Sequence, residues 1–448
     1  MGTRSIGESR DARPAPHPVT VPAHVPGAVP AAIPMPAAAA AAPASSPSSR
    51  LHQVFAALHE RDFRIFWLGQ LVSVTGTWMQ TVAQGWLILT LTGSPFVLGV
   101  AAAARSVPVL LLVIPAGIIA DRYDRRRIVL TTSIVSTIAS GAMGVLAVTN
   151  RIDVPIVLAI AVVLGVSNAF EMPARQSYVS ELIGRRHLAN AIALNSLLFN
   201  SARVVGPAIA GVLVALIGPG WAFVLNAASF VPVIIGLLLI SKVHVPRTGI
   251  MARTAIPETV RYLRTEPRIT ALLGLLAAQT IFASGNYILG PSLAQDLGQG
   301  AEGLGVLLSA AGAGAVVGGL RLAATANRAE RWRVLLAAGL AISAGLIGVG
   351  LTSSYPVTLL CFVVSGWGVV TFNASANTLI QTIAPDQLRG RVMSLYTLAL
   401  LGLMPVGGIL MGSLASLLGS ATAIAIGGAI YVAVVALAFG FVRALRRV

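Results

Sequence analysis

The chain has 448 residues, of which 56% are hydrophobic and only 10% are charged, and its formal net charge is +16. Soluble globular domains carry roughly a quarter of their residues as charged side chains, so this composition excludes a soluble protein and indicates a polytopic membrane protein. The single cysteine, Cys361, excludes an intramolecular disulfide. The six histidines fall in tails, loops and span ends without metal-ligand spacing, so we expect no metal site in the membrane.

Residues 1–50 are dominated by proline, alanine, serine and charged residues, as in "PAAIPMPAAAAAAPASSPSS". Frequent proline prevents a stable helix, and the segment has too few apolar side chains for a core, so it predicts a disordered cytoplasmic tail. It lacks the basic start, single apolar block and cleavage site of a secretory signal.

Twelve apolar stretches follow, each long enough to cross a bilayer as a helix, which takes about 20 residues. We expect spans at 63–90, 95–119, 128–148, 154–178, 188–217, 221–241, 268–290, 302–324, 334–352, 356–381, 392–418 and 421–442. The long connection 242–267 divides them into bundles at 51–241 and 268–448. Its segment "PETVRYLRTEP" predicts either an amphipathic helix at the membrane surface or a simple tether.

The arginines predict the orientation of the chain in the membrane. They gather in every second connection, at 122–127, 185–186, 242–268, 321–333, 389–391 and 443–447. The connections on the opposite side hold only Arg151. Because positive charge is retained on the cytoplasmic side, both termini are expected there. The same pattern accounts for the net charge without a nucleic-acid partner.

The two bundles share an internal repeat. A shift of 206 residues places "LGV" (98–100) on "LGV" (304–306), and "DRYDRRR" (121–127) on "NRAERWR" (327–333). A shift of 201 residues places "GPAIAGVLVALIG" (206–218) on "GGILMGSLASLLG" (407–419). Matching charged loops are not explained by apolar composition alone. The pattern therefore indicates a duplicated six-span unit, an organisation in which transporters bind substrate between the repeats.

Several segments resemble the major facilitator superfamily. "GIIADRYDRRR" (117–127) resembles its signature loop between spans 2 and 3, with Asp124 where the loop usually carries glycine. "GPAIAG" (206–211) resembles the span 5 motif of its antiporters, with Ala210 in place of one glycine. "EMPARQSYVSEL" and "NSLLFNSARVVGPAIAG" are similar to the enterobactin-exporter-like branch of bacterial efflux permeases.

This resemblance implies an all-α integral membrane protein with twelve transmembrane helices in two pseudo-symmetric six-helix bundles. It also implies a cofactor-free monomer of the bacterial cytoplasmic membrane that exports a siderophore-like or drug-like molecule, with proton antiport as the energy source.

The resemblance assigns roles to two sets of residues. An inner gate is implied for Gly117, Asp121, Arg122, Asp124, Arg125 and Arg127. In this gate Asp121 and Arg122 would bridge to inner helix ends when the cytoplasmic side is closed, with Glu171 or Glu181 as partners. A role at the interface between the halves is implied for Gly206, Pro207 and Gly211. From their chemistry alone, these small residues indicate only tight helix packing.

Glu171 is the one acidic residue placed clearly inside the hydrocarbon region, and Glu181 follows at the cytoplasmic mouth of the same helix. Ionisable groups in the membrane are costly and commonly functional, so Glu171 is a candidate for proton coupling. Arg175 lies four residues later in the favourable acid-then-base order. A structural or gating ion pair is therefore the alternative.

Arg105 and Arg203 are expected near mid-membrane, where arginine needs a carboxylate, backbone carbonyls or an anionic ligand. Glu171 cannot neutralise Arg105, Arg175 and Arg203 together. We expect either a net positive cavity suited to anionic or multiply hydroxylated substrates, or arginines satisfied by carbonyls and polar side chains.

Polar residues at helical spacing occur in spans 1 and 10. They are Gln70, Ser73, Thr77, Gln80 and Gln84 in the first, and Asn373 and Asn377 in the second. A lipid-facing position would leave these groups without partners, so we expect them to line the substrate cavity or to join helices by hydrogen bonds.

The sequence contains no phosphate-binding glycine–lysine loop, which argues against ATP-driven pumping. With one carboxylate clearly inside the hydrocarbon region and no histidine there, an enzyme is not expected either. The prediction is secondary export of a small molecule, with the proton and the lipid bilayer as further partners. Uptake or facilitated diffusion, and a transport-inactive sensor or scaffold, stay open as alternatives.

Overall fold

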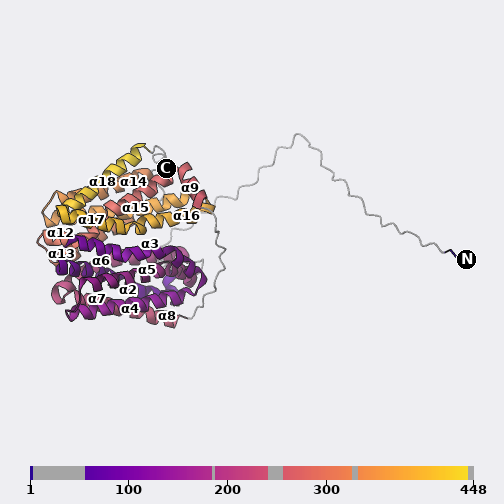
Figure 1. Cartoon of the computed structure of the whole chain (residues 1–448), viewed down its shortest axis with the longest axis horizontal. Coiled ribbons are helices and arrows are strands. Elements are labelled where there is room, and N and C mark those ends of the chain that lie inside the picture. The colour runs from indigo at the N-terminus through magenta and orange to yellow at the C-terminus, as the bar shows by residue number, and fades with distance from the viewer. Residues whose placement is uncertain (4–55, 184–186, 241–255, 325–330, 442–448) are drawn as a thin grey trace, which may run out of the picture. The chain divides into compact units, whose positions relative to one another are not determined.

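A computed structural model describes residues 1–3, 56–183, 187–240, 256–324 and 331–441 (Figure 1). The predicted tail, most of the linker and residues 325–330 of the repeated charged loop lie outside the described residues. Residues Leu51–Val448 form one compact unit in which both predicted bundles take part. All regular structure in the described ranges is helical.

The N-terminal half contains helices that follow the predicted spans closely. They are η1 (Ala56–His59), α2 (Arg61–Thr92), α3 (Pro95–Arg122), α4 (Arg125–Val148), α5 (Val154–Ile183), α6 (Leu188–Ile217), α7 (Pro219–Ser229) and α8 (Val231–Leu239). Local chemistry sets their ends. Gly93 ends α2 in the left-handed region, at φ 63°, and Asp124 caps α4 by accepting a 2.9 Å bond from the Arg126 backbone.

The C-terminal half is more interrupted. Its elements are α9 (Ile256–Thr265), α10 (Pro267–Phe282), α11 (Gly285–Ile288), α12 (Gly290–Asp296), α13 (Ala301–Ala324), α14 (Arg331–Gly350), α15 (Tyr355–Ile383), α16 (Asp386–Thr397), η2 (Leu398–Gly402), α17 (Met404–Leu418) and α18 (Ser420–Phe441). The helices α10 and α11 fill the seventh predicted span, at whose end α12 begins, and α16, η2 and α17 fill the eleventh. The segment η2 is a π-helix.

Prolines contribute to these interruptions. Pro232 lies just after the break at Phe230 between α7 and α8, and Pro291 just after the break at Leu289. Because proline lacks the N–H that would bond four residues back, each weakens the helix at the preceding turn. The predicted span 221–241 is thus divided at Phe230, and the predicted span 268–290 is divided between α10 and α11 and again at Leu289.

Eleven stretches within the described residues are long and apolar enough to cross a membrane. The helix α2, with 32 residues, is long enough but is not among them. Its polar residues lower its hydropathy, yet Gln70, Gln80 and Gln84 are all buried. The polar face of α2 is therefore turned into the protein, which is consistent with a twelfth span.

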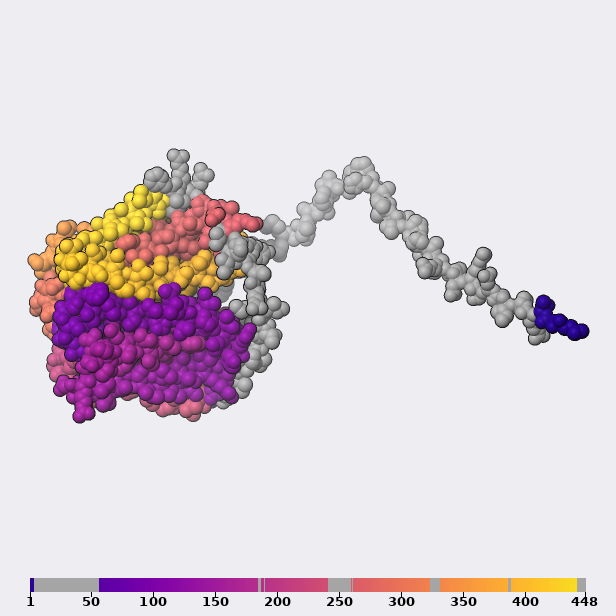
Figure 2. Space-filling model, in the orientation of Figure 1, coloured from indigo at the N-terminus to yellow at the C-terminus, as the bar shows by residue number. Residues whose placement is uncertain are grey.

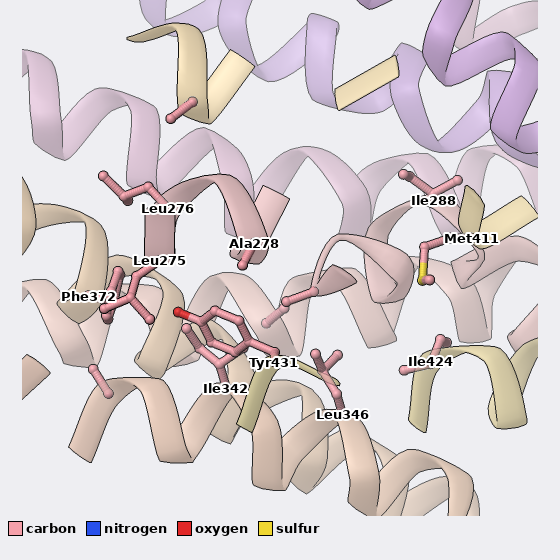
Figure 3. Packing of buried hydrophobic residues seen from close by; sticks show 14 of the residues in the cluster. Leu275, Leu276, Ala278, Ile288, Ile342, Leu346, Phe372, Met411, Ile424 and Tyr431 are labelled. Atoms are coloured by element: carbon pink, nitrogen blue, oxygen red, sulfur yellow. The ribbon is translucent and has the colours of Figure 1, made fainter. Parts of the chain in front are cut away.

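The apolar core differs between the halves. In the C-terminal half one continuous cluster joins α10, α14, α15 and α18, with Leu275, Ile342 and Phe372 packed around Tyr431 (Figure 3). The N-terminal half has two main clusters, one around Phe66 and Tyr178 and the other around Phe223. This half also contains buried polar residues, among them Gln70, Gln80, Ser140 and Asn226.

Candidate functional site

The helices α3 and α17, from opposite halves, cross at glycines. A Cβ atom on Gly99 would lie 2.1 Å from the Gly408 carbonyl oxygen and 3.2 Å from the Gly412 Cα. Only glycine allows two backbones this close. Figure 2 shows the indigo and purple surface of the N-terminal half meeting the yellow surface of the C-terminal helices along one face.

The helices α6 and α13 form a second crossing between the halves. A Cβ atom on Gly305 would lie 2.6 Å from the Pro207 carbonyl oxygen and 2.8 Å from the Gly211 Cα. Ser309 Oγ also donates a 2.8 Å hydrogen bond to the Val204 carbonyl oxygen. The shifts of the sequence repeat relate the two crossings, because they carry Gly99 to Gly305, and Pro207 and Gly211 to Gly408 and Gly412.

Both crossings lie toward the same end of the molecule. They are close to the helix termini at Pro95, Ile217, Ala301 and Leu418. The described arginine clusters lie at the other end. Direct backbone packing therefore joins the two halves at the arginine-poor end.

At the arginine-rich end, Arg125 joins three parts of the N-terminal half. Its Nε donates to the Ala120 carbonyl oxygen at 3.0 Å, and its guanidinium forms ion pairs with Glu181 and with Asp121, the latter at 3.4 Å. Arg126 donates to the Leu237 carbonyl oxygen at 2.6 Å. The charged loop thus holds the ends of α3, α5 and α8 together.

Part of the same loop is left exposed. The side chain of Asp121 is 68% exposed and that of Arg127 is 86% exposed. A Cβ atom on Gly117 would have no neighbour within 4 Å. Arg125 pairs with Glu181 in this structure, and the bridge that the resemblance implies for Asp121 and Arg122 in the closed state stays a prediction. The exposed charges remain available to a second surface.

Glu171 and Arg175 form an ion pair of 3.2 Å on α5, and both side chains are nearly buried. Arg175 also donates to Gln70 Oε1 at 3.3 Å and lies 4.7 Å above the ring of Phe199. The second predicted role of Glu171, as an ion-pair partner, is thus present in the structure, and proton coupling stays a prediction.

Arg105 interacts electrostatically with the same carboxylate of Glu171. Arg105 and Arg175 thus lie near the Glu171 carboxylate, and a third guanidinium, that of Arg203, belongs to the midpoint of α6. This region carries an excess of positive charge.

Gln80 joins helices by hydrogen bonds, which is the second of the two roles predicted for the polar residues of this span. Its Oε1 accepts hydrogen bonds from Ser140 at 2.7 Å and from Asn226 at 2.5 Å, which joins α2 to α4 and α7. Ser73 and Gln84 are buried, and Thr77 Oγ1 donates to the Ser73 carbonyl oxygen at 3.0 Å.

On α15, Asn377 accepts a 2.5 Å bond from Gln381 at an exposed position. Asn373 Oδ1 is buried without a partner among the described residues, whereas its carbonyl oxygen accepts from Tyr396. The two asparagines thus differ in what they offer a ligand.

Arg203 lies at the midpoint of α6, and its Cζ is 5.3 Å from the centre of the Trp78 ring. The Trp78 ring in turn lies 6.4 Å from that of Tyr287, which belongs to the other half. Tyr287 was not among the predicted cavity residues, although the break-forming residues in "FASGNYILGPS" signal an interrupted span.

The family model of the transmembrane secretion effectors matches residues 52–447, almost the entire helical region. The chain belongs to this family of major facilitator transporters. It is accordingly a multi-pass protein of the bacterial cytoplasmic membrane.

Curated relatives are similar at modest identity over most of their length. The multidrug efflux pump Tap of Mycolicibacterium fortuitum is 28% identical over 78% of this chain and 88% of the relative. The enterobactin exporter of Salmonella typhimurium is 26% identical over 80% of this chain and 86% of the relative. The staphyloferrin A transporter of Staphylococcus aureus is 25% identical over 80% and 90%.

Solved structures support the fold at low sequence identity. A POT family transporter bound to 5-aminolevulinic acid superposes with a TM-score of 0.72, at 12% identity over 86% of this chain and 97% of that one. An inward-facing, unoccupied bacterial homologue of the lysosomal transporter Spinster has a TM-score of 0.65, at 17% identity over 90% and 98%.

Proposed function

We propose that this protein is a secondary exporter of a small anionic organic molecule, that it works by alternating access, and that proton antiport drives it. The observation that carries the proposal is the pair of glycine crossings at one end, combined with an excess of buried positive charge between them and the exposed charged loop. Known relatives that export siderophores or drugs support the direction of transport.

We place the arginine-rich end in the cytoplasm, by the positive-inside rule, with α2 as the first of twelve spans. In this orientation the glycine crossings close the outer side. The exposed Asp121 and Arg127 side chains and the open space at Gly117 then belong to an inner side that has not closed. The arrangement supports an inward-open state, ready to load cargo from the cytoplasm.

Glu171 is the group we assign to proton coupling. Its carboxylate is nearly buried and touches Arg175, while Arg105 lies within its electrostatic reach. Protonation of Glu171 would break its ion pair with Arg175 and change the charge at the site. We assign Glu171 to proton exchange on this ground.

Uptake or facilitated diffusion, and a transport-inactive sensor, are the competing functions. Purified protein in proteoliposomes with an imposed pH gradient separates them. The probes are a panel of labelled organic anions and a pH-sensitive dye in the lumen. Antiport predicts that each transported anion moves protons in the opposite direction. Flux without proton movement would indicate facilitated diffusion, and absence of any flux would contradict transport.

A Glu171→Gln variant tests the coupling residue in the same vesicles. It keeps the size of the side chain and a hydrogen-bond acceptor for Arg175 but cannot release a proton. We expect gradient-driven flux to fall at least about tenfold, with exchange of labelled for unlabelled substrate retained. Glu302→Gln, at an exposed position on α13, is the matched control. Equal gradient-driven flux in the Glu171→Gln variant and the wild type would rule out Glu171 as the coupling group.

A further inference from the structure

The seventh span is interrupted where it faces the other half. The helix α10 ends at Phe282, and the four residues of α11 are bounded by Ser284 and Leu289. Ser284 Oγ is buried and has no hydrogen-bond partner within the described residues. Substrate sites of transporters with internal repeats are typically formed by such discontinuous helices near mid-membrane.

Across from this break lies a cation without a counter-ion. Arg203 makes no hydrogen bond and no ion pair within the described part of the chain, and its recorded contact is with the Trp78 ring. Of its three nitrogens, Nε alone is enclosed without a partner. A guanidinium carries five N–H donors, so the terminal donors of Arg203 are left for a ligand.

Two aromatic rings flank this cation, one from each half. The centres of Trp78 and Tyr287 are 6.4 Å apart and their planes are inclined at 48°. Rings inclined in this way do not stack face to face on each other, and the Arg203 guanidinium lies over the Trp78 ring beside them. Gly206 leaves room for Trp78, since a Cβ atom there would lie 2.5 Å from the Trp78 Cβ.

We propose that Arg203, Trp78 and Tyr287 select a flat aromatic anion, an aromatic carboxylate or phenolate. Its oxygens take the terminal N–H groups of Arg203, and its ring packs against Trp78 and Tyr287. A neutral aromatic molecule would leave Arg203 unpaired, and an aliphatic polycarboxylate would leave both rings without a planar partner. The inference rests on the proposed export function, because it names the substrate class of that site.

Equilibrium binding to the full-length protein in nanodiscs tests this selection without any gradient. The probes are radiolabelled salicylate, which is an aromatic carboxylate, together with phenol and citrate as competitors. We expect saturable salicylate binding, with phenol and citrate each weaker by about tenfold or more, because a charge-assisted hydrogen bond and a ring contact each contribute that much. Absence of saturable salicylate binding overturns the proposal, as does equal competition by phenol or citrate.

Variants separate recognition from a structural role of the same residues. The Arg203→Gln variant should lose the preference for salicylate over phenol. The Trp78→Leu variant should lose the preference for salicylate over citrate. Trp86→Leu, on the same helix α2, is the matched control and should preserve both preferences. If the variants lower thermal stability but keep both ratios, the cluster is structural and the proposal is wrong.

The experiments distinguish a failure of the proposed transport function from a failure of the proposed binding site. Salicylate that binds with both preferences but is never moved in proteoliposomes would contradict transport and leave the binding site intact. Flux of other organic anions with unchanged binding ratios in the variants would contradict the site and leave transport intact.

Discussion

The two crossings between the halves descend from the same repeat but differ in what holds them. At α3–α17 the contact is made by the backbone of three glycines, and a Cβ atom added to Gly99 would lie 2.1 Å from the Gly408 carbonyl oxygen. At α6–α13, Pro207 stands where the other crossing has Gly408, and Ser309 adds a hydrogen bond to the Val204 carbonyl oxygen. Ala103 occupies the position equivalent to Ser309.

The helices that lead into the crossings differ as well. The helix α6 runs unbroken from Leu188 to Ile217, whereas α17 is preceded by the π-helical turn Leu398–Gly402 and a break at Leu403. π-Helical turns interrupt the regular hydrogen-bond ladder and commonly mark functional positions. The α6–α13 crossing is therefore the more rigid of the two. At the α3–α17 crossing, α17 is the helix that can bend.

The largest effect is expected at the tighter crossing. Gly99→Leu inserts a branched side chain where even one carbon would meet the Gly408 carbonyl, so α3 and α17 must separate at this crossing. We expect transport to fall at least about tenfold. Spin labels at positions 96 and 416, in a Cys361→Ser background, should report a longer distance between α3 and α17.

Gly274→Ala on α10 is the control, because a Cβ atom there has no neighbour within 4 Å. An unchanged label distance in the Gly99→Leu protein would show that the crossing yields locally and does not close the outer side.

The second prediction concerns the arginine-rich end, where ion pairs of the charged loop, and not glycine crossings, hold the helix ends together. Asp121→Asn removes an exposed charge that supports no buried contact beyond its 3.4 Å pair with Arg125. We expect normal membrane insertion and thermal stability but a collapse of transport, because the latch cannot form. Asp296→Asn, exposed on α12, should leave flux unchanged. Full flux in the Asp121→Asn protein would refute the latch.

A smaller effect is expected from the hydrogen bond that distinguishes the crossings. Ser309→Ala removes the donor to the Val204 carbonyl oxygen and should destabilise the protein by about 1 kcal/mol. The distance between paired spin labels should increase across the α6–α13 crossing and stay unchanged across the α3–α17 crossing. Thermal unfolding in detergent measures the first result, and paired spin labels measure the second. Equal lengthening at both crossings would contradict the distinction.

The smallest effect involves Glu266, beside the start of the C-terminal half. Its bidentate pair with Arg268, at 2.6 and 2.8 Å, holds the pKa of this carboxyl below its usual range. A lowered pKa stabilises the folded state above the unfolded pKa, about 4.3, and this contribution is lost as pH falls through the folded value. Glu266→Gln should therefore lower the melting temperature slightly at pH 7.

The difference between Glu266→Gln and wild type should begin to shrink as pH falls below about 4.3, and it should disappear only below the lowered pKa of the folded state. The packing-based differences at the crossings should not follow pH in this way. A Glu266→Gln difference that stays constant down to pH 3 would mean that the pair contributes through packing alone.

Much of the helical framework could be predicted, because apolar length and loop arginines are local properties of the chain. The helix α5 extends five residues beyond the span predicted to end at 178, since it continues past the apolar part as far as Ile183. Interruptions were harder to predict. Pro405 lies just after the break at Leu403 and signals an interruption. The π-helical form of the turn Leu398–Gly402 is not signalled, because this turn contacts α3 and α10, which lie far away in sequence.

Partners within the site could be predicted only where they share a helix. Glu171 and Arg175 are four residues apart, so their ion pair was one of two predicted outcomes. Arg125 and Glu181 are 56 residues apart, and the loop pattern gave no reason to prefer Arg125 over Arg122. Gln80 likewise finds Asn226 through the packing of α2 against α7, which spacing along one helix cannot reveal.

The burial of polar side chains along α2 has a consequence for biogenesis. This helix precedes α3 in the chain and falls short of the hydropathy that its eleven neighbours reach. Insertion by the translocon depends on the hydrophobicity of each segment, so α2 should enter the bilayer inefficiently by itself. It should insert together with α3 as a hairpin, and Gln80 should become shielded only when α4 and α7 arrive. The polar face of α2 thus imposes an order on membrane assembly.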